Sequence, residues 1–188
     1  GLWIDLGSGT GLLAKSLEKE APDQAVMRID NAKEMLDQDQ PKSNWKHWDL
    51  NNGIPPLSEN PQLLASSFAL HWLNNPAARL EEWAKELAPG GWIALATPIQ
   101  GSFQEWHQAA AKANVPCTAI SLPTQISLMR ALRTMRIHYQ EVHAYKDSST
   151  NLKALFKPII NVGAQATKTG SLTASQWKRL KMFWPRSG

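Results

Sequence analysis

The sequence predicts an α/β protein with a doubly wound, mostly parallel β-sheet and a helical cover at its C-terminal end. In the first half of the chain, short apolar segments alternate with amphipathic ones, which is the order of strands and crossover helices in such a sheet. A glycine-rich turn follows the first apolar segment, and acidic residues end the second and third. With 188 residues, we expect a single domain that buries an ample core.

Parallel strands are expected in the first half, where apolar runs of strand length lie between turn signals. They are 2–4, 25–30, 45–49, 62–67 and 92–97. Helices are expected between them where apolar residues recur at helical spacing, over 12–20, 32–36 and 76–87. The segment Ala88-Pro89-Gly90-Gly91 ends the last of these, because proline and glycine disfavour continuation of a helix.

The second half is predicted to be mainly helical. Helices are expected over 102–113, 123–133, 152–162 and 174–183, and a sixth strand over 136–145. Pro158 interrupts the third of these helices and Gly163 ends it. No strand is expected beyond Gly163, so the end of the chain is predicted to be a helical cover rather than more sheet.

Composition excludes several classes of partner. The formal net charge of +4 is too small to indicate nucleic-acid binding by itself. No apolar run approaches the ~18 residues of a membrane-spanning helix, so no membrane partner is expected. Cys117 is the single cysteine, which excludes an intramolecular disulfide and favours a cytoplasmic location. There is no zinc-type spacing of cysteine and histidine, so no metal site is expected.

The stretch "DLGSGTG" (residues 5–11) predicts a ligand-binding turn between the first strand and the first helix. Glycine lets a backbone approach a ligand closely, and a helix N-terminus favours polar or anionic groups. The NAD fingerprint is G-x-G-x-x-G, but Leu12 stands where its third glycine would fall. Asp5 would repel a diphosphate and suits an amino group, so the turn favours S-adenosylmethionine and disfavours an NAD-dependent oxidoreductase.

Two further acids lie where parallel strands are expected to end. Asp30 ends the second strand, where a ribose diol would meet it, and Asp49 ends the third, where it would accept a hydrogen bond from an adenine amine. The carboxyl ends of parallel strands form the edge at which ligands bind. The alternatives are a helix N-cap for Asp30 and a turn residue for Asp49.

The motifs "IDLGSGTG", "RID" followed by "EML", and "LAPGGWIAL" resemble those of class I S-adenosylmethionine-dependent methyltransferases. The resemblance implies a Rossmann-like, cofactor-binding core over 1–97 and a substrate-side region with a helical insert over 98–188. It also implies that the glycine turn lines the methionine part, that Asp30 binds the ribose and that Met35 lies near the adenine. The predicted cofactor-binding residues are Asp5, Gly7, Ser8, Gly9, Gly11, Asp30, Asn31, Met35, Asp49, Leu50 and Ser66.

Three later stretches are similar to the malonyl-acyl-carrier-protein O-methyltransferases of biotin synthesis. They are "SSFALHWLNNP", "ALATPIQGSFQEW" and the tail "NLKALFKPIINVGAQATKTGSLTASQWKRL". The similarity implies methylation of the free carboxylate of malonyl-acyl carrier protein or malonyl-CoA. It also implies a helix before the first strand and a final antiparallel strand after the insert, both outside these residues. Trans-aconitate methyltransferases share a similar "LHW" stretch, so a free small acid is the alternative acceptor, as is a quinone precursor or an inactive cofactor-binding fragment.

Few residues indicate acid–base chemistry. No catalytic residue is predicted, and the protein is expected to act only by positioning the substrate and the cofactor. His71 and Trp72 are candidates to border the transferable methyl group; the alternatives are a loop residue and a core wall. Arg130, Arg133 and Arg136 form either a patch for an acidic carrier protein or a solvated helical face. No base is expected beside Cys117, so it is not expected to be a nucleophile.

Overall fold

The computed structural model describes residues 1–38, 44–145 and 172–184. These residues form two compact units, which we treat separately. The first comprises Gly1–Gln100 and Leu122–Arg136, and the second comprises Gly101–Ser121 and Ile137–Gly188. The expected single domain, and its division into 1–97 and 98–188, stay predictions.

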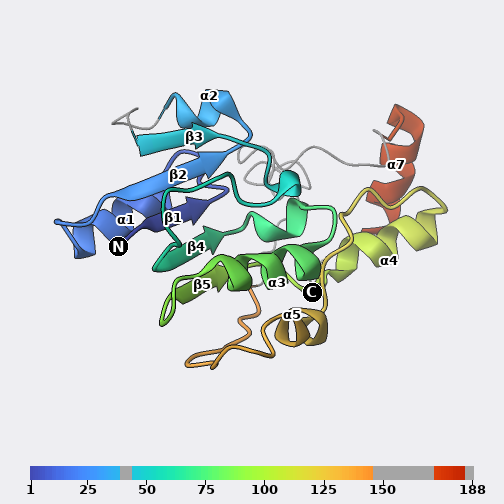
Figure 1. Cartoon of the computed structure of the whole chain (residues 1–188). Helices are drawn as coiled ribbons and strands as arrows, with labels where there is room; N and C mark the ends of the chain where they lie inside the picture. Colours follow the sequence, from blue (N-terminus) through green and yellow to red (C-terminus); the bar gives the residue numbers. More distant parts are fainter. Residues whose placement is uncertain (39–43, 146–171, 185–188) are drawn as a thin grey trace. The chain divides into compact units, whose positions relative to one another are not determined.

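The first unit contains the predicted parallel sheet (Figure 1). Its strands are β1 (Trp3–Leu6), β2 (Val26–Asp30), β3 (Trp45–His47), β4 (Leu63–Ser67) and β5 (Trp92–Ala96). They pair in the order β3-β2-β1-β4-β5, and every pairing is parallel. The doubly wound α/β class is therefore confirmed. The carboxyl ends of all these strands share one edge, which we call the carboxyl edge.

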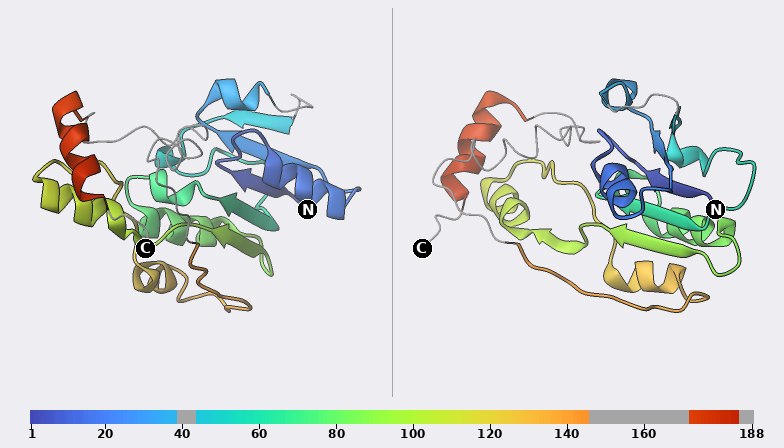
Figure 2. Two further views of the ribbon diagram at one scale, coloured as in Figure 1. Left: turned by 180° about the vertical axis from the view of Figure 1, so that it is seen from behind. Right: turned by 90° about the vertical axis from the view of Figure 1, so that its left-hand side faces the viewer.

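The first unit has helices on both faces of the sheet (Figures 1 and 2). They are α1 (Leu12–Glu20), α2 (Lys33–Leu36), α3 (Pro76–Glu86) and α5 (Gln125–Ala131), with 3-10 turns at η2 (Leu50–Asn52) and η3 (Leu70–Trp72). The start of α3 is encoded locally: Asn75 accepts a hydrogen bond from Ala78 N–H at 3.2 Å, and Pro76 follows at the first helical position.

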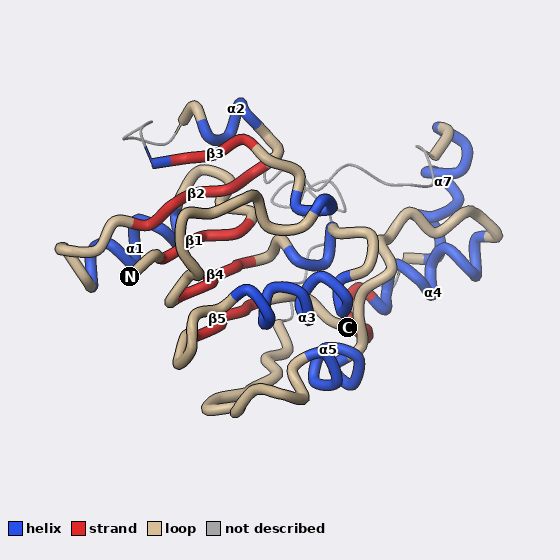
Figure 3. The backbone as a smooth tube through the Cα atoms, in the orientation of Figure 1, coloured by secondary structure: helices blue, strands red, loops and turns tan. Residues whose placement is uncertain are grey.

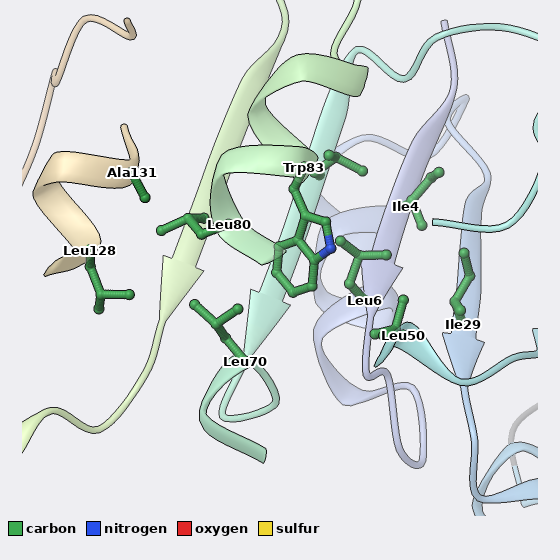
Figure 4. Packing of buried hydrophobic residues seen from close by; sticks show 10 residues of the cluster. Ile4, Leu6, Ile29, Leu50, Leu70, Leu80, Trp83, Leu128 and Ala131 are labelled. Carbon is green, nitrogen blue, oxygen red and sulfur yellow. The ribbon is translucent and has the colours of Figure 1, made fainter. Parts of the chain in front are cut away.

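The apolar core lies between the sheet and α3 (Figure 4). Trp83, 1% exposed, packs with Leu80 of the same helix toward Ile4 and Leu6 of β1. Burying a side chain of this size contributes about 1.5–3 kcal/mol. Side chains alternate between the two faces along a strand. Asp5 of β1 and Arg28 of β2 therefore face α1, on the other side of the sheet.

That other face carries a buried ion pair that the sequence pattern did not indicate. Arg28 on β2 is 1% exposed, and its Nη1 and Nη2 donate to the two carboxylate oxygens of Glu18 on α1 at 2.7 and 2.8 Å. Nη1 also donates to the carbonyl of Val26. This fork-to-fork geometry joins α1 to β2 by two charge-assisted hydrogen bonds.

In the second unit, α4 (Gln104–Ala113) packs against α7 (Ala174–Phe183) (Figures 1 and 2). Small alanines of α4 allow the close approach, and Leu180 of α7 is fully buried against them. Thr173 and Gln176 form a reciprocal capping box at the start of α7. In the described part of the chain, no helix is long and apolar enough to cross a bilayer.

The predicted sixth strand is wrong. Residues 136–145 have no regular secondary structure and are drawn as loop in Figure 3. All residues of this segment are exposed, including Tyr139 at 78% and Val142 at 56%, so it has no buried face. A segment with strand-like residues forms a strand only where a neighbouring strand supplies hydrogen bonds and a surface for its side chains.

Helix boundaries in the second half also shift. The helix expected from residue 102 begins at 104, because a short strand, β6 (Gln100–Phe103), precedes it and Phe103 adopts a positive φ of 59°. The helix expected over 123–133 is the shorter α5. The helix predicted over 152–162 lies outside the described residues.

Candidate functional site

The glycine turn connects β1 to α1 at the carboxyl edge. Gly7, Gly9 and Gly11 have φ values of 72°, 53° and 75°, a region that other residues adopt only at a cost. The N–H groups of Gly7 and Ser8 both donate to the carbonyl of Ile29, at 2.8 and 3.1 Å. These bonds attach the turn to the end of the neighbouring strand β2.

Two of these glycines serve different purposes. A β-carbon at Gly7 would overlap that of Ala69, so the turn packs directly on the segment that follows β4. A β-carbon at Gly9 would meet no atom within 4 Å. The space above Gly9 is therefore open, as a turn that receives a ligand requires, whereas Gly7 is needed for packing.

Asp30 connects the turn to the segment beyond β2. Its Oδ2 accepts from Gly9 N–H at 2.8 Å, and its Oδ1 accepts from Ala32 N–H at 2.8 Å. The N-cap position of α2 is Ala32 and no side chain caps it, so the helix-cap alternative describes Asp30 incompletely. The carboxylate is half-buried at the carboxyl edge and keeps lone pairs for a diol.

The next residues along this edge surround the ends of β2 and β3. Asn31 is exposed, and its carbonyl oxygen lies 3.0 Å from His47 Nε2. Met35 on α2 is half-buried. Asp49 is exposed and its Oδ1 accepts from the backbone and side-chain nitrogens of Asn51 at 2.9 and 3.0 Å. Asp49 thus caps η2, as the turn-residue alternative expected.

Three predicted cofactor-binding residues are instead largely enclosed in the protein. Asp5 is 1% exposed and its Oδ2 accepts from Ala14 N–H at 3.1 Å, which satisfies a free donor at the N-terminus of α1. Ser66 is 3% exposed and donates to the carbonyl of Leu6 at 2.8 Å. Leu50 belongs to the core. These contacts support the turn from beneath, and direct ligand contact of these residues stays a prediction.

Two buried polar atoms near the turn lack a hydrogen-bond partner in the described part of the chain. They are the Oγ of Ser8, 9% exposed, and the Nδ1 of His71, 7% exposed. Ser8 follows β1 and His71 lies in η3 after β4, the neighbouring strand. A buried polar atom without a partner costs about 1–3 kcal/mol. Both atoms would be satisfied by a polar ligand at this edge.

Burial also decides the charge of His71. Desolvation lowers its pKa from 6.5 to about 4, so its imidazole is neutral at pH 7. Its ring lies 5.1 Å from that of Trp72, which is half-buried. His71 is therefore buried rather than a surface loop residue, and the role of both residues beside the methyl group stays a prediction.

Phe68 is a residue of this edge that the sequence prediction missed. It follows β4 directly, has a positive φ of 54° and is 61% exposed. Its N–H donates to the carbonyl of Ala96 at 2.8 Å. The signal in the sequence was a large aromatic residue immediately after a strand that ends at the ligand-binding edge.

The remaining candidates lie elsewhere. Arg130, Arg133 and Arg136 are exposed, but only Arg130 is on α5, and Arg133 pairs with Glu81 of α3 at 3.3 Å. They do not form a single helical face. The expectation for Cys117 is corrected: its Sγ lies 3.2 Å from Nδ1 of His107, because the chain beyond α4 folds back beside that helix.

These residues define a class of protein: a Rossmann-like fold with a glycine turn, open above Gly9, and an acid at the end of β2. Buried polar atoms without partners and carboxylates at one edge fit a nucleoside cofactor with a cationic end. A family profile described as "Methyltransferase domain" matches residues 1–156. The chain belongs to this methyltransferase family, and its cofactor is S-adenosylmethionine.

Two kinds of similar protein match the chain. The chain is 32% identical over 181 residues to a biotin biosynthesis bifunctional protein BioCD of Bordetella avium, covering 91% of this chain and 38% of that protein. It is 32% identical over 111 residues to a trans-aconitate 2-methyltransferase of Mycobacterium tuberculosis, covering 58% of this chain and 41% of that protein. The chain thus spans less than half the length of these relatives.

Solved structures show the same fold. The YcgJ protein of Bacillus subtilis superimposes with a TM-score of 0.61 at 15% identity, covering 96% of this chain and 75% of that one. An S-adenosylmethionine-dependent methyltransferase of Thermotoga maritima has a TM-score of 0.53 at 17% identity, covering 71% and 62%. At these identities the likeness concerns the fold alone.

Proposed function

We propose that this methyltransferase domain methylates the free carboxylate of malonyl-acyl carrier protein, or of malonyl-CoA, to a methyl ester in biotin biosynthesis. The observation that carries this proposal is the extent of the match to the BioCD protein, which runs through 91% of the chain. The trans-aconitate methyltransferase match stops at 58%. The match to the biotin protein therefore extends into the second half of the chain, where we propose that the acceptor binds.

The chemistry needs no acid–base pair. A carboxylate is already ionised at neutral pH, so the enzyme has no proton to remove. The cofactor supplies a methyl group on a sulfonium sulfur; the carboxylate oxygen bonds to that carbon as the carbon–sulfur bond breaks, and the electron pair stays on sulfur. Catalysis then depends on alignment and on removal of water from the carboxylate.

The residues of the carboxyl edge have distinct parts in this proposal. Asp30 holds the ribose while its bond to Gly9 keeps the turn in position. Ser8 Oγ and His71 Nδ1, both buried without a partner in the described part of the chain, bind polar groups of the cofactor or acceptor. Because His71 is neutral, it orients a carboxylate by hydrogen bonding and leaves it reactive.

A free tricarboxylic acid is the second candidate acceptor, since the trans-aconitate methyltransferases share 32% identity over their match. A quinone precursor, or a fragment that binds cofactor without turnover, are the remaining alternatives. For a carrier-bound acceptor, the exposed side chains of Arg130, Arg133 and Arg136 are candidate contacts for an acidic carrier protein, with Arg133 also paired to Glu81.

The test is transfer of label from methyl-labelled S-adenosylmethionine to malonyl-acyl carrier protein, with malonyl-CoA and trans-aconitate as parallel acceptors. We expect label in the malonyl acceptors that base hydrolysis releases, as a methyl ester requires. Label in trans-aconitate alone would replace our acceptor with the second candidate. Cofactor binding without label in any acceptor would contradict the proposed reaction and leave the family assignment intact.

A further inference from the structure

Phe68 combines two features that cost free energy and gain little from packing. Its φ of 54° is a conformation that a bulky side chain rarely adopts. Its ring is 61% exposed, so burial in the core does not offset that cost. Unfavourable backbone conformations that persist in folded proteins cluster at ligand sites. An exposed aromatic in such a conformation suggests that the ring has a ligand.

The surrounding structure holds this conformation rigidly. Phe68 N–H donates to Ala96 at the end of β5, at 2.8 Å. The next residue, Ala69, lies where a β-carbon on Gly7 would fall, and Leu70 after it is fully buried. Phe68 is thus fixed between the end of β4 and the glycine turn, on the edge that receives the cofactor.

The charges of this edge favour a cation there. Asp30 and Asp5 contribute carboxylates on β2 and β1, next to the turn. His71, three residues beyond Phe68, carries no charge at pH 7. The two carboxylates make the potential at this edge negative, and a cation there also complements the electron-rich face of an aromatic ring.

We propose that the ring of Phe68 binds the sulfonium of S-adenosylmethionine by a cation–π contact. The inference rests on the proposed function, because it concerns the reactive end of the same cofactor. The sulfonium loses its charge when the methyl group leaves, so the contact favours S-adenosylmethionine over the neutral thioether product, S-adenosylhomocysteine. A contact of this kind changes affinity by about twofold to thirtyfold. Phe68 would thereby select substrate over product.

The test compares the affinities of the full chain for the two compounds by isothermal titration calorimetry. Phe68→Leu retains an apolar side chain without the π face, and Phe68→Tyr retains the π face. Phe68→Ala removes the ring altogether. Phe68→Gly also removes it and favours the observed positive φ, so it replaces Phe68→Ala if that variant does not fold. Trp92→Ala is the matched control, since Trp92 is an aromatic residue, 54% exposed, at the opposite end of the sheet on β5.

We expect Phe68→Leu and Phe68→Ala to lose about fivefold to tenfold of the preference for S-adenosylmethionine, with the affinity for S-adenosylhomocysteine changed by less than about twofold. Phe68→Tyr and Trp92→Ala should keep the preference. A preference that survives in Phe68→Leu, or equal weakening of both compounds, would overturn the proposal. If the unaltered chain binds neither compound, the proposed function fails as well; if it binds both but methylates no acceptor, only the proposed acceptor fails.

Discussion

The carboxylate of Asp30 accepts a hydrogen bond from the backbone N–H of Gly9 at 2.8 Å, so the acid that ends β2 and the turn after β1 are joined directly. Neither element alone would be rigid at this point, because Gly9 has no side chain to pack. The bond sets the turn at a fixed height above the sheet. A ribose held by Asp30 and a methionine moiety held by the turn would therefore bind cooperatively.

Asp30→Asn should separate the charge of this residue from its shape. The amide preserves an acceptor for Gly9 but weakens the charge-assisted bonds to the turn and to a ribose diol, so we expect affinity for S-adenosylmethionine to fall about tenfold or more. Titration calorimetry measures this change. Asp23→Asn, an exposed acid before β2, is the control and should bind normally. Equal affinities of the two variants would remove Asp30 from the site.

Gly7→Ala should destabilise the fold, whereas Gly9→Ala should not do so to the same degree. At Gly7 the added methyl meets Ala69, and we expect a loss of about 2–4 kcal/mol in the free energy of unfolding. At Gly9 there is open space, so only the backbone cost of about 1–2 kcal/mol applies. Urea unfolding measures both. Adding Ala69→Gly to Gly7→Ala should recover part of the loss; no recovery would show that the overlap is not its cause.

The Arg28–Glu18 pair should respond asymmetrically to truncation. Glu18→Ala leaves a guanidinium that is 1% exposed without its carboxylate, and we expect a loss of about 3–5 kcal/mol. Arg28→Met leaves a carboxylate that is 28% exposed and stays partly hydrated, so the loss should be smaller, about 1–2 kcal/mol. Chemical denaturation of both variants and of the double variant measures the coupling. A double variant less stable than Glu18→Ala would contradict this account.

Stability should fall in mild acid partly because of His71. The pKa of His71 is about 4 in the folded chain and 6.5 ordinarily. Between these pH values the imidazole is protonated in the unfolded chain and neutral in the folded chain. The stability contributed by the neutral ring is present above pH 6.5 and is lost as the pH falls toward 4. We expect about 1–3 kcal/mol from this group, since partial hydration reduces the full effect.

Urea unfolding of the unaltered chain and of His71→Gln at pH 7 and pH 5 isolates this contribution, because all other titrating groups are common to both. The variant should lose less stability between the two pH values. The same loss in both proteins would mean that the imidazole becomes protonated without cost, in conflict with its burial.

The sequence pattern within a few residues was sufficient to predict most strands of the sheet, the glycine turn and the start of α3. The strands that became β1, β2, β4 and β5 are short, mostly apolar runs bounded by turn signals. The glycine turn and the proline that begins α3 have conformational preferences of their own. The same reasoning failed for 136–145, which has no partner strand in the described part of the chain. A strand depends on a neighbour distant in sequence, which periodicity does not report.

The class of this protein follows from short stretches of sequence, because the glycine spacing and the acid that ends the second strand depend on backbone geometry within a few residues. Tertiary structure decided which residues at this edge are buried: Asp5 is enclosed against α1, Ser66 donates to the carbonyl of Leu6, and Phe68 is exposed beside the turn. It also paired Cys117 with His107 and Arg28 with Glu18. Burial and charge pairing are set by segments that meet only in the folded chain, so no local pattern specifies them.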